Sequence, residues 1–320
     1  MRILVIRRDN IGDLACTTPL LDGLRRAQPG AWIGVLANTY NAEVLARNHA
    51  VDTVFAYEKL KHRERPLFGF MADRVRLAIE LRRHRPDWIL VPAPAPQAVQ
   101  YARGLKAGRI VLGDTQDGRH EVLRTWAVGK ELGVVGEPGP MHVYPDPARV
   151  AQVRVFGDGR PVVAVHVSAR RPKQRWPESR YIALVAEIAA RQPVMLLWSP
   201  GLQTDARHPG DDEMAARILE ATKGLPVRGV ETRELASLVA ALSVVDCVIC
   251  PDGGAMHLAA ALGKPVVALF GDSPVQRWRP WGVRHRVVRP DSGDLADLPV
   301  DAVLAAHAEL SGIGRDQDRA

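Results

Sequence analysis

The chain has 320 residues and a mass of 35.0 kDa, about twice the length of a typical single domain, so we expect two domains. Hydrophobic residues make up 47% and charged residues 25% of the chain, a composition that argues against a mostly disordered protein. The formal net charge of +7 fits anionic partners, but the sequence has no zinc-finger spacing, helix-turn-helix pattern or aromatic-interleaved basic stripe, so we expect no nucleic-acid binding.

The first half of the chain alternates short apolar runs with helical stretches. We expect strands at 2–7, 32–37, 51–57, 88–93 and 108–113, and helices near 17–27, 41–47 and 70–85. Strands that are apolar throughout and separated by helices are typical of a parallel sheet covered on both faces. The first half therefore predicts a Rossmann-like α/β domain.

A stretch rich in proline and glycine, 136–161, follows and is the best candidate for a linker. After it the alternation resumes, with strands expected at 161–167, 193–199, 227–230, 246–250 and 265–271 and helices near 178–191, 211–222, 235–245 and 255–263. The pattern predicts two Rossmann-like domains, 1–150 and 151–320, with a cleft between them.

The cellular setting is predicted from what the sequence lacks. No apolar run approaches the ~18 residues that a membrane span needs, and the N-terminus has no apolar core of the kind found in signal peptides. Three cysteines are too few for a disulfide framework, which indicates a reducing cytoplasm. We interpret the two cysteines of CVIC (247–250) as small buried hydrophobic residues.

The loops that follow strands are where chemistry is expected, because ligands of such sheets bind beyond the carboxyl ends of the strands. The first such loop, 7–19, turns at Gly12 and carries two carboxylates, Asp9 and Asp13. Asp13 falls at the start of a helix, where it is either an N-cap or a catalytic carboxylate. The loop lacks GxGxxG spacing, which argues against a dinucleotide fingerprint.

A second loop combines glycines with two polar side chains. Asp252 ends a strand, and Gly253 and Gly254 allow close approach of the backbone just ahead of a helix. The free N–H groups and the positive dipole end of that helix predict a phosphate cradle, with His257 in the first turn. Gly-Gly also occurs in ordinary strand–helix turns.

Two further segments are strongly basic. The loop 166–181 crowds four cations before a helix expected to begin near Pro177, namely Arg170, Arg171, Lys173 and Arg175. Such a cluster suits a diphosphate, and its plain alternative is a solvated loop. The stretch 59–86, with nine Lys/Arg against three Asp/Glu, is either a solvated helix face or a surface for anionic lipid or a phosphorylated acceptor.

The loops resemble the motifs of one family, the ADP-heptose:lipopolysaccharide heptosyltransferases (glycosyltransferase family 9). The segments that carry the resemblance are IGDLACTTPLLDGLRRAQPGAWI (11–33), HEV (120–122), DGGAMHLAAALGKPVVALFG (252–271) and SPVQRWRPWG (273–282). The resemblance implies an α/β GT-B fold, two Rossmann-like domains facing each other across a cleft. It places the acceptor on domain 1–150 and the nucleotide sugar on domain 151–320, and it leaves open that the C-terminal helix packs back on the first domain.

The same resemblance implies an activity. The chain is expected to be an inverting glycosyltransferase that moves a heptose from ADP-heptose to a lipopolysaccharide inner-core acceptor, with no metal or other cofactor. Its expected partners are an ADP-sugar donor and a lipid-linked saccharide acceptor, with peripheral contact to the anionic cytoplasmic face of the inner membrane. Two alternatives remain, a catalytically inactive sugar-nucleotide-binding relative and a GT-B-fold sugar-nucleotide epimerase or hydrolase.

Site residues follow from the resemblance motif by motif. Asp13 becomes the general base, in an acceptor-side loop with Asp9, Asn10 and Gly12. The resemblance implies a donor-binding turn that consists of Asp252, Gly253, Gly254, Ala255, Met256 and His257, and we assign Glu213 to the ribose.

The chain departs from the family pattern at two positions. Where the family carries a phosphate-binding cation two residues before a tryptophan, this chain has Gln174, so either Lys173 or Arg175 must take the role. We favour Lys173, because Arg175 is expected to stack on the adjacent Trp176. Gly253 also lacks the hydroxyl that many members carry there, which makes that phosphate contact a backbone one.

Overall fold

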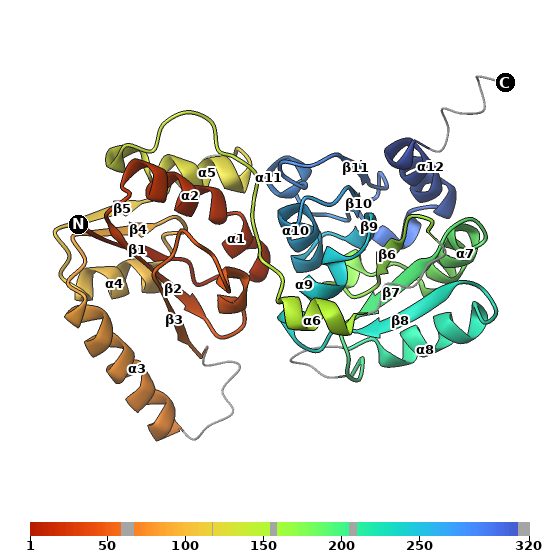
Figure 1. The fold of residues 1–320 in the computed structure, drawn as a ribbon, viewed down its shortest axis with the longest axis horizontal. Helices are drawn as coiled ribbons and strands as arrows, with labels where there is room; N and C mark the ends of the chain where they lie inside the picture. The colour runs from red at the N-terminus through yellow and green to blue at the C-terminus, as the bar shows by residue number, and fades with distance from the viewer. Residues whose placement is uncertain (59–66, 117, 154–158, 205–209, 313–320) are drawn as a thin grey trace. The chain divides into compact units, whose positions relative to one another are not determined.

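The computed structural model describes residues 1–58, 67–116, 118–153, 159–204 and 210–312, and the chain divides into two compact units, Met1–Tyr144 and Pro145–Ala320 (Figure 1). The boundary falls six residues before the expected one. The reason is α6 (Pro147–Gln152), which packs against α9 (Leu235–Ser243) of the second unit. Arg149 of α6 donates to Ser237 Oγ at 3.0 Å and forms an ion pair with Glu234.

The first unit is built on a five-stranded parallel sheet in the order β3-β2-β1-β4-β5. Its strands are β1 (Arg2–Ile6), β2 (Trp32–Asn38), β3 (Thr53–Tyr57), β4 (Trp88–Val91) and β5 (Arg109–Leu112). In register, Val5 of β1 lies between Val35 and Leu90, and all three side chains are buried. The strand order therefore changes direction at β1, and in such sheets this is the point where ligands bind.

The expected strands of this unit are all present, but its helices differ from the prediction. They are α1 (Ile11–Ala15), α2 (Thr18–Ala27), α3 (Leu67–Arg83), α4 (Pro96–Gly104) and α5 (Glu121–Ala127), with 3-10 turns at Ala42–Leu45 and Lys130–Leu132. The helix expected near 41–47 is thus a single 3-10 turn. Asp13 lies in the first turn of α1, at the helix start expected there. The helices α4 and α5 were not expected, because they span only nine and seven residues, too few for a clear 3.6-residue periodicity.

The second unit repeats the plan with a six-stranded parallel sheet in the order β11-β10-β9-β6-β7-β8. Its strands are β6 (Val163–His166), β7 (Val194–Trp198), β8 (Val227–Glu231), β9 (Cys247–Pro251), β10 (Val266–Leu269) and β11 (His285–Val288). Here the order changes direction at β6, between β7 and β9. The loops after β6 and β9 therefore lie at the binding edge of this sheet.

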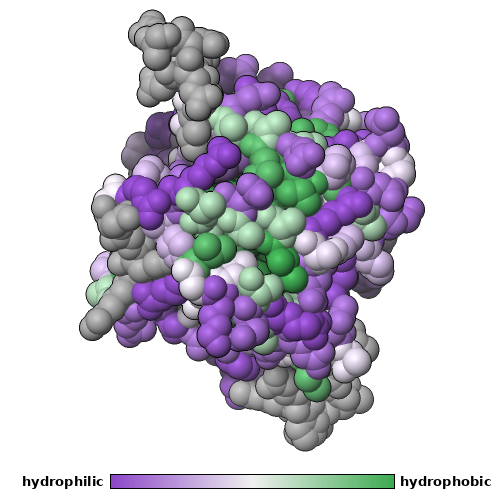
Figure 2. Space-filling model, turned by 90° about the vertical axis from the view of Figure 1, so that its right-hand side faces the viewer, coloured by the Kyte–Doolittle hydropathy of each residue, from purple (hydrophilic) through white to green (hydrophobic). Residues whose placement is uncertain are grey.

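Helices cover both faces of the second sheet (Figure 1). They are α6, α7 (Glu178–Ala189), α8 (Asp212–Ala221), α9 (Leu235–Ser243), α10 (Gly254–Ala261), α11 (Val275–Trp278) and α12 (Val300–Ser311), with 3-10 turns at Pro172–Gln174 and Leu295–Asp297. The last described helix, α12, packs on α7, β10 and β11 of this unit. Figure 2 shows hydrophobic residues gathered in the middle of one face of this unit.

The interior of the second unit is apolar and includes the CVIC segment. Cys247 and Cys250 are free and buried, as is Cys16 of the first unit, and burial raises the pKa of the Cys247 thiol to about 12. The prediction that these residues act as small buried hydrophobic side chains is confirmed. Within the described part of the chain, no helix combines the length and apolar character that a membrane crossing requires.

Candidate functional site

Asp13 lies on α1, just beyond the carboxyl end of β1. Its Oδ1 accepts a hydrogen bond from Arg7 Nη2 at 2.9 Å, and its Oδ2 accepts from the backbone N and the Nδ2 of Asn10, both at 3.0 Å. The N-cap of α1 is Asn10 and not Asp13, which occupies the third helical position of a capping box. A carboxylate has about four lone-pair sites, so one remains on Oδ1 of a side chain that is still 13% exposed.

Arg7 holds Asp13 through a buried network of charges. The Arg7 side chain is fully buried, with its Nη2 also 2.6 Å from Glu121 Oε1 and its Nε 3.3 Å from Asp9 Oδ2. Glu121 in turn accepts from Arg124 Nη1 at 2.6 Å. Burial alone would lower the pKa of Arg7, but the three carboxylates around it raise that pKa above its ordinary value. Arg7 is therefore a permanent cation that fixes the orientation of Asp13.

Sequence reasoning did not single out Arg7, Glu121 or Arg124 as site residues. A charged residue directly after an apolar strand was the available signal for Arg7, and the i,i+3 spacing of Glu121 and Arg124 was the signal for an ion pair on a helix. Of the other residues expected in this loop, Asn10 is the cap described above and Gly12 is buried inside α1.

In the second unit, the loop after β9 leads into α10 as expected. Gly253 is the N-cap of α10, and no side-chain hydrogen bond from the described residues caps this helix. Gly253 has an extended backbone (φ 166°), and a Cβ built there meets no atom within 4 Å. The first turn thus presents backbone donors beside open space, which is the arrangement that binds phosphate.

The remaining residues of that turn, Ala255, Met256 and His257, are all buried. The ring of His257 packs edge-to-face against Trp278 of α11, with 6.0 Å between ring centroids. This contact packs the segment 273–282 against the start of α10 and holds the His257 ring in position.

The three loops after β6, β9 and β10 meet at one edge of the second sheet. Gln174, buried in the loop after β6, donates from Nε2 to Asp252 Oδ2 at 2.9 Å and to Ser273 Oγ at 2.8 Å. A Cβ at Gly271 would lie 2.3 Å from the backbone oxygen of Lys173, so only glycine fits at this contact. Burial raises the pKa of Asp252. The hydrogen bond with Ser273 and the positive charge of Arg171 act in the opposite direction but are smaller.

Lys173 and Arg175 have different surroundings in this loop. Lys173 is exposed and has no carboxylate partner among the described residues. Arg175 is only 23% exposed and lies 3.5 Å from the buried Asp211. The expectation that Arg175 stacks on Trp176 is wrong, because Trp176 packs edge-to-face on Tyr181 and donates to the backbone oxygen of Leu298 at 2.9 Å.

Among the described residues, no hydrogen bond or ion pair links Glu213 to these three loops. It lies on α8 with its side chain 65% exposed, and its ion pair is with Arg217 of the same helix at 3.7 Å. Its neighbour Asp212 accepts from Trp198 Nε1 at 2.7 Å and from the backbone N of Gly201 at 2.9 Å. Among the residues that the structure describes, no three His, Cys, Asp or Glu side chains form a group that could hold a metal ion.

His166, the last residue of β6, makes the stability of this edge sensitive to acid. Burial lowers the pKa of His166 to about 4, against an ordinary value of 6.5. As the pH falls below 6.5 the unfolded chain binds a proton that the folded chain does not, so stability is lost progressively down to about pH 4. The full loss is about 3 kcal/mol for a difference of this size.

We therefore expect His166→Gln to flatten the fall in unfolding free energy between pH 6.5 and 4. The measurement is chemical denaturation at a series of pH values, compared with wild type and with His142→Gln, a half-exposed histidine of the first unit. An equal slope for wild type and His166→Gln would contradict the prediction.

Comparison with known proteins agrees with the geometry. The family model described as glycosyltransferase family 9 (heptosyltransferase) matches residues 113–302, more than half of the chain. The chain is 24% identical over 343 residues to lipopolysaccharide heptosyltransferase 2 of Salmonella typhimurium (strain LT2), an alignment that covers 98% of this chain and 95% of that protein.

Solved structures share the fold. The crystal structure of the glycosyl transferase family 9 protein of Veillonella parvula matches with a TM-score of 0.81 at 20% identity, over 97% of this chain and 96% of that one. An Escherichia coli heptosyltransferase with bound ADP-2-deoxy-2-fluoro heptose matches with a TM-score of 0.78 at 20% identity, over 97% and 99% of the two chains. The likeness identifies the architecture as that of the GT-B heptosyltransferases.

Proposed function

Since the chain belongs to glycosyltransferase family 9, the heptosyltransferase family, it is a glycosyltransferase, and we propose that it transfers a heptose from ADP-heptose to a lipopolysaccharide inner-core saccharide with inversion at the anomeric carbon. The first unit binds the acceptor and the second binds the donor. The transfer takes place in the cytoplasm, at the cytoplasmic face of the inner membrane, where a lipid-linked acceptor is presented.

The main observation behind this proposal is the hydrogen bonding of the Asp13 carboxylate. Three hydrogen bonds fix its carboxylate and leave one lone pair on Oδ1, which is what a general base needs. In the transfer, an acceptor hydroxyl oxygen bonds to the anomeric carbon of the heptose and the bond from that carbon to the ADP oxygen breaks. The hydroxyl proton passes to Oδ1 of Asp13, and Arg7 stays charged and keeps that oxygen in position.

The loop cluster of the second unit suits the leaving group. ADP departs with increasing negative charge on its terminal phosphate, and this charge is stabilised by groups that are already in place. The uncapped N–H groups at the start of α10 and the exposed Lys173 supply that stabilisation. Gln174, which replaces the family's cation, orients Asp252 and Ser273 through its two hydrogen bonds.

The test is an assay of ADP release from ADP-heptose with and without a deacylated inner-core acceptor. We expect rapid ADP release only with acceptor, and NMR of the product should show the inverted anomeric configuration. ADP release without acceptor would favour a hydrolase, and an altered sugar nucleotide would favour an epimerase. Binding of ADP-heptose with no reaction would favour an inactive relative.

We also expect the transfer rate to be unchanged in excess EDTA. The reason is that the helix start of α10 and the basic loop replace the charge that a metal would supply. The measurement is the same assay with EDTA added before the donor. Full loss of activity that Mg²⁺ or Mn²⁺ restores would show that a carboxylate such as Asp252 holds a metal.

A further inference from the structure

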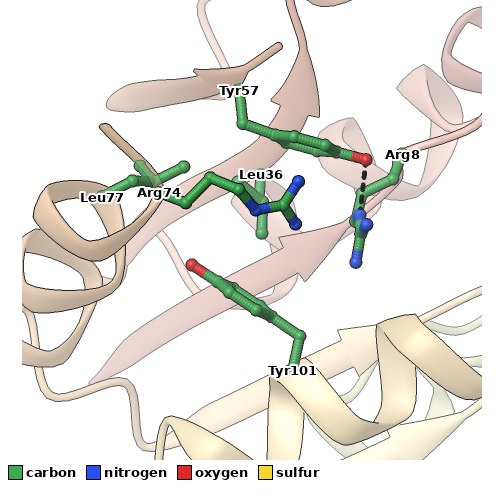
Figure 3. Close-up of a pocket in the computed structure, with 6 residues that line it drawn as sticks. All are labelled: Arg8, Leu36, Tyr57, Arg74, Leu77 and Tyr101. Atoms are coloured by element: carbon green, nitrogen blue, oxygen red, sulfur yellow. Dashed lines mark hydrogen bonds between the residues drawn. The ribbon is translucent and has the colours of Figure 1, made fainter. Parts of the chain in front are cut away.

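A small pocket lies in the first unit, at the carboxyl end of its sheet and one residue along the chain from Arg7. Its cavity volume is about 10 Å³. The loop after β1, the strands β2 and β3 and the helices α3 and α4 provide its lining (Figure 3): Arg8, Leu36, Tyr57, Arg74, Leu77 and Tyr101. None of these residues belongs to the network that holds Asp13.

The pocket places two positive charges between two aromatic rings. Arg8 donates from Nε to Tyr57 Oη at 2.7 Å, and its guanidinium carbon lies 4.7 Å from the centroid of the Tyr57 ring. The guanidinium of Arg74 lies 5.1 Å from the same ring, and Figure 3 shows both guanidinium groups reaching into the space between Tyr57 and Tyr101. Two cationic groups therefore face the same small space, and this arrangement attracts an anion.

Tyr101 provides the second observation. Its hydroxyl is buried and has no hydrogen-bond partner among the residues that the structure describes, which costs free energy unless another group supplies one. Burial raises the pKa of Tyr101, although Arg74, Arg8 and Arg82 oppose the rise. The hydroxyl is therefore protonated at neutral pH and can donate to an incoming oxygen.

The groups that line the pocket fit an oxyanion. No carboxylate of the described residues forms an ion pair with Arg8, so its terminal nitrogens are not neutralised by the protein. A guanidinium fork matches the two oxygens of a carboxylate or phosphate. A cavity volume of about 10 Å³ corresponds to about one water-sized sphere, so the enclosed part of the pocket has room for an oxygen of a charged substituent rather than for a sugar ring.

We propose that this pocket binds a carboxylate or phosphate substituent of the acceptor saccharide, held by Arg8, Arg74 and the Tyr101 hydroxyl. The assignment of the substituent to the acceptor rests on the proposed function of the first unit. Because Arg8 follows Arg7 directly in the chain, an anion in the pocket would fix the acceptor relative to the loop that carries Asp13.

The experiment is an NMR titration of the ADP-saturated protein with methyl phosphate and, separately, with acetate, observed at the Nε–H signal of Arg8. ADP fills the donor site, so the probes report on the pocket. Arg74→Gln is compared with Arg83→Gln, which removes the same charge from an exposed position of the same helix. Tyr101→Phe removes only the unpartnered hydroxyl.

We expect Arg74→Gln to weaken the probe that binds by at least about tenfold, and Arg83→Gln to leave its dissociation constant unchanged. Tyr101→Phe should weaken binding by about two- to tenfold, with a melting temperature equal to or above that of wild type. The preferred probe identifies the substituent as a phosphate or a carboxylate.

No shift of the Arg8 signal with either probe, or equal losses in Arg74→Gln and Arg83→Gln, would overturn the proposal. The titration needs no turnover, so the two proposals can fail separately. Probe binding in a protein that transfers no heptose would refute the proposed function and leave the pocket assigned. Heptose transfer by a protein that binds neither probe would support the proposed function and refute the assignment of the pocket.

Discussion

Replacing Asp13 by Asn is expected to lower turnover by about 10²- to 10⁴-fold, the contribution typical of a general base. The amide cannot take the proton of the acceptor hydroxyl, whereas the donor is bound by other groups. The dissociation constant for ADP-heptose should therefore stay within a few-fold of wild type, and kcat should carry the loss. The measurement is steady-state kinetics at saturating acceptor, together with calorimetric titration of the donor.

The control must separate catalysis from stability, because the Asp13→Asn substitution would also place an amide nitrogen against a donor of Arg7 or Asn10. Asp52 is a suitable match, since its Oδ2 likewise accepts from an arginine, Arg25, and from a backbone N–H, that of Ile33, both at 2.7 Å. We expect Asp52→Asn to lose stability while its turnover stays close to wild type. Near-normal turnover of Asp13→Asn would leave Asp13 with only its role in the capping box.

Replacing Lys173 by Ala is expected to weaken ADP binding by about ten- to over a hundredfold, the value of one charge-assisted contact. Arg175→Ala should act differently, because Arg175 is already paired with the buried Asp211. Loss of that partner leaves a buried carboxylate unpaired, so we expect a decrease in unfolding free energy of about 1–3 kcal/mol and a small effect on ADP. The double variant should bind ADP no more weakly than Lys173→Ala.

Calorimetric titration of ADP into the three variants decides between the two cations, with thermal melts run in parallel. Lys223→Ala is the control, since Lys223 is an exposed lysine of the same unit whose ion pair is with Glu220. A double variant much weaker than either single variant would mean that both cations share the diphosphate. Unchanged ADP affinity in all of them would remove this loop from the donor site.

The fold was predictable because its signals are local. Apolar runs such as Val163–His166 and Val194–Trp198 became buried parallel strands, and the helix after Gly254 begins where its glycines indicated. The short helices α4 and α5 were not predicted, because nine and seven residues carry too little periodicity. The boundary between the units falls earlier than expected, because α6 lies inside the proline-rich stretch 136–161 and packs on α9 of the second unit.

The sequence by itself determined the chemical groups at the strand ends: Asp13, the Asp252–Gly254 turn, and a basic loop beside Trp176. Only the tertiary structure decided what holds them. Arg7 and Glu121 are 114 residues apart, and Gln174 is 78 residues from Asp252 and 99 from Ser273. Such contacts depend on which strands are neighbours in a sheet, and local periodicity carries no information about strand order. The different surroundings of Lys173 and Arg175 likewise depend on Asp211, which reaches Arg175 only because the sheet brings their loops together.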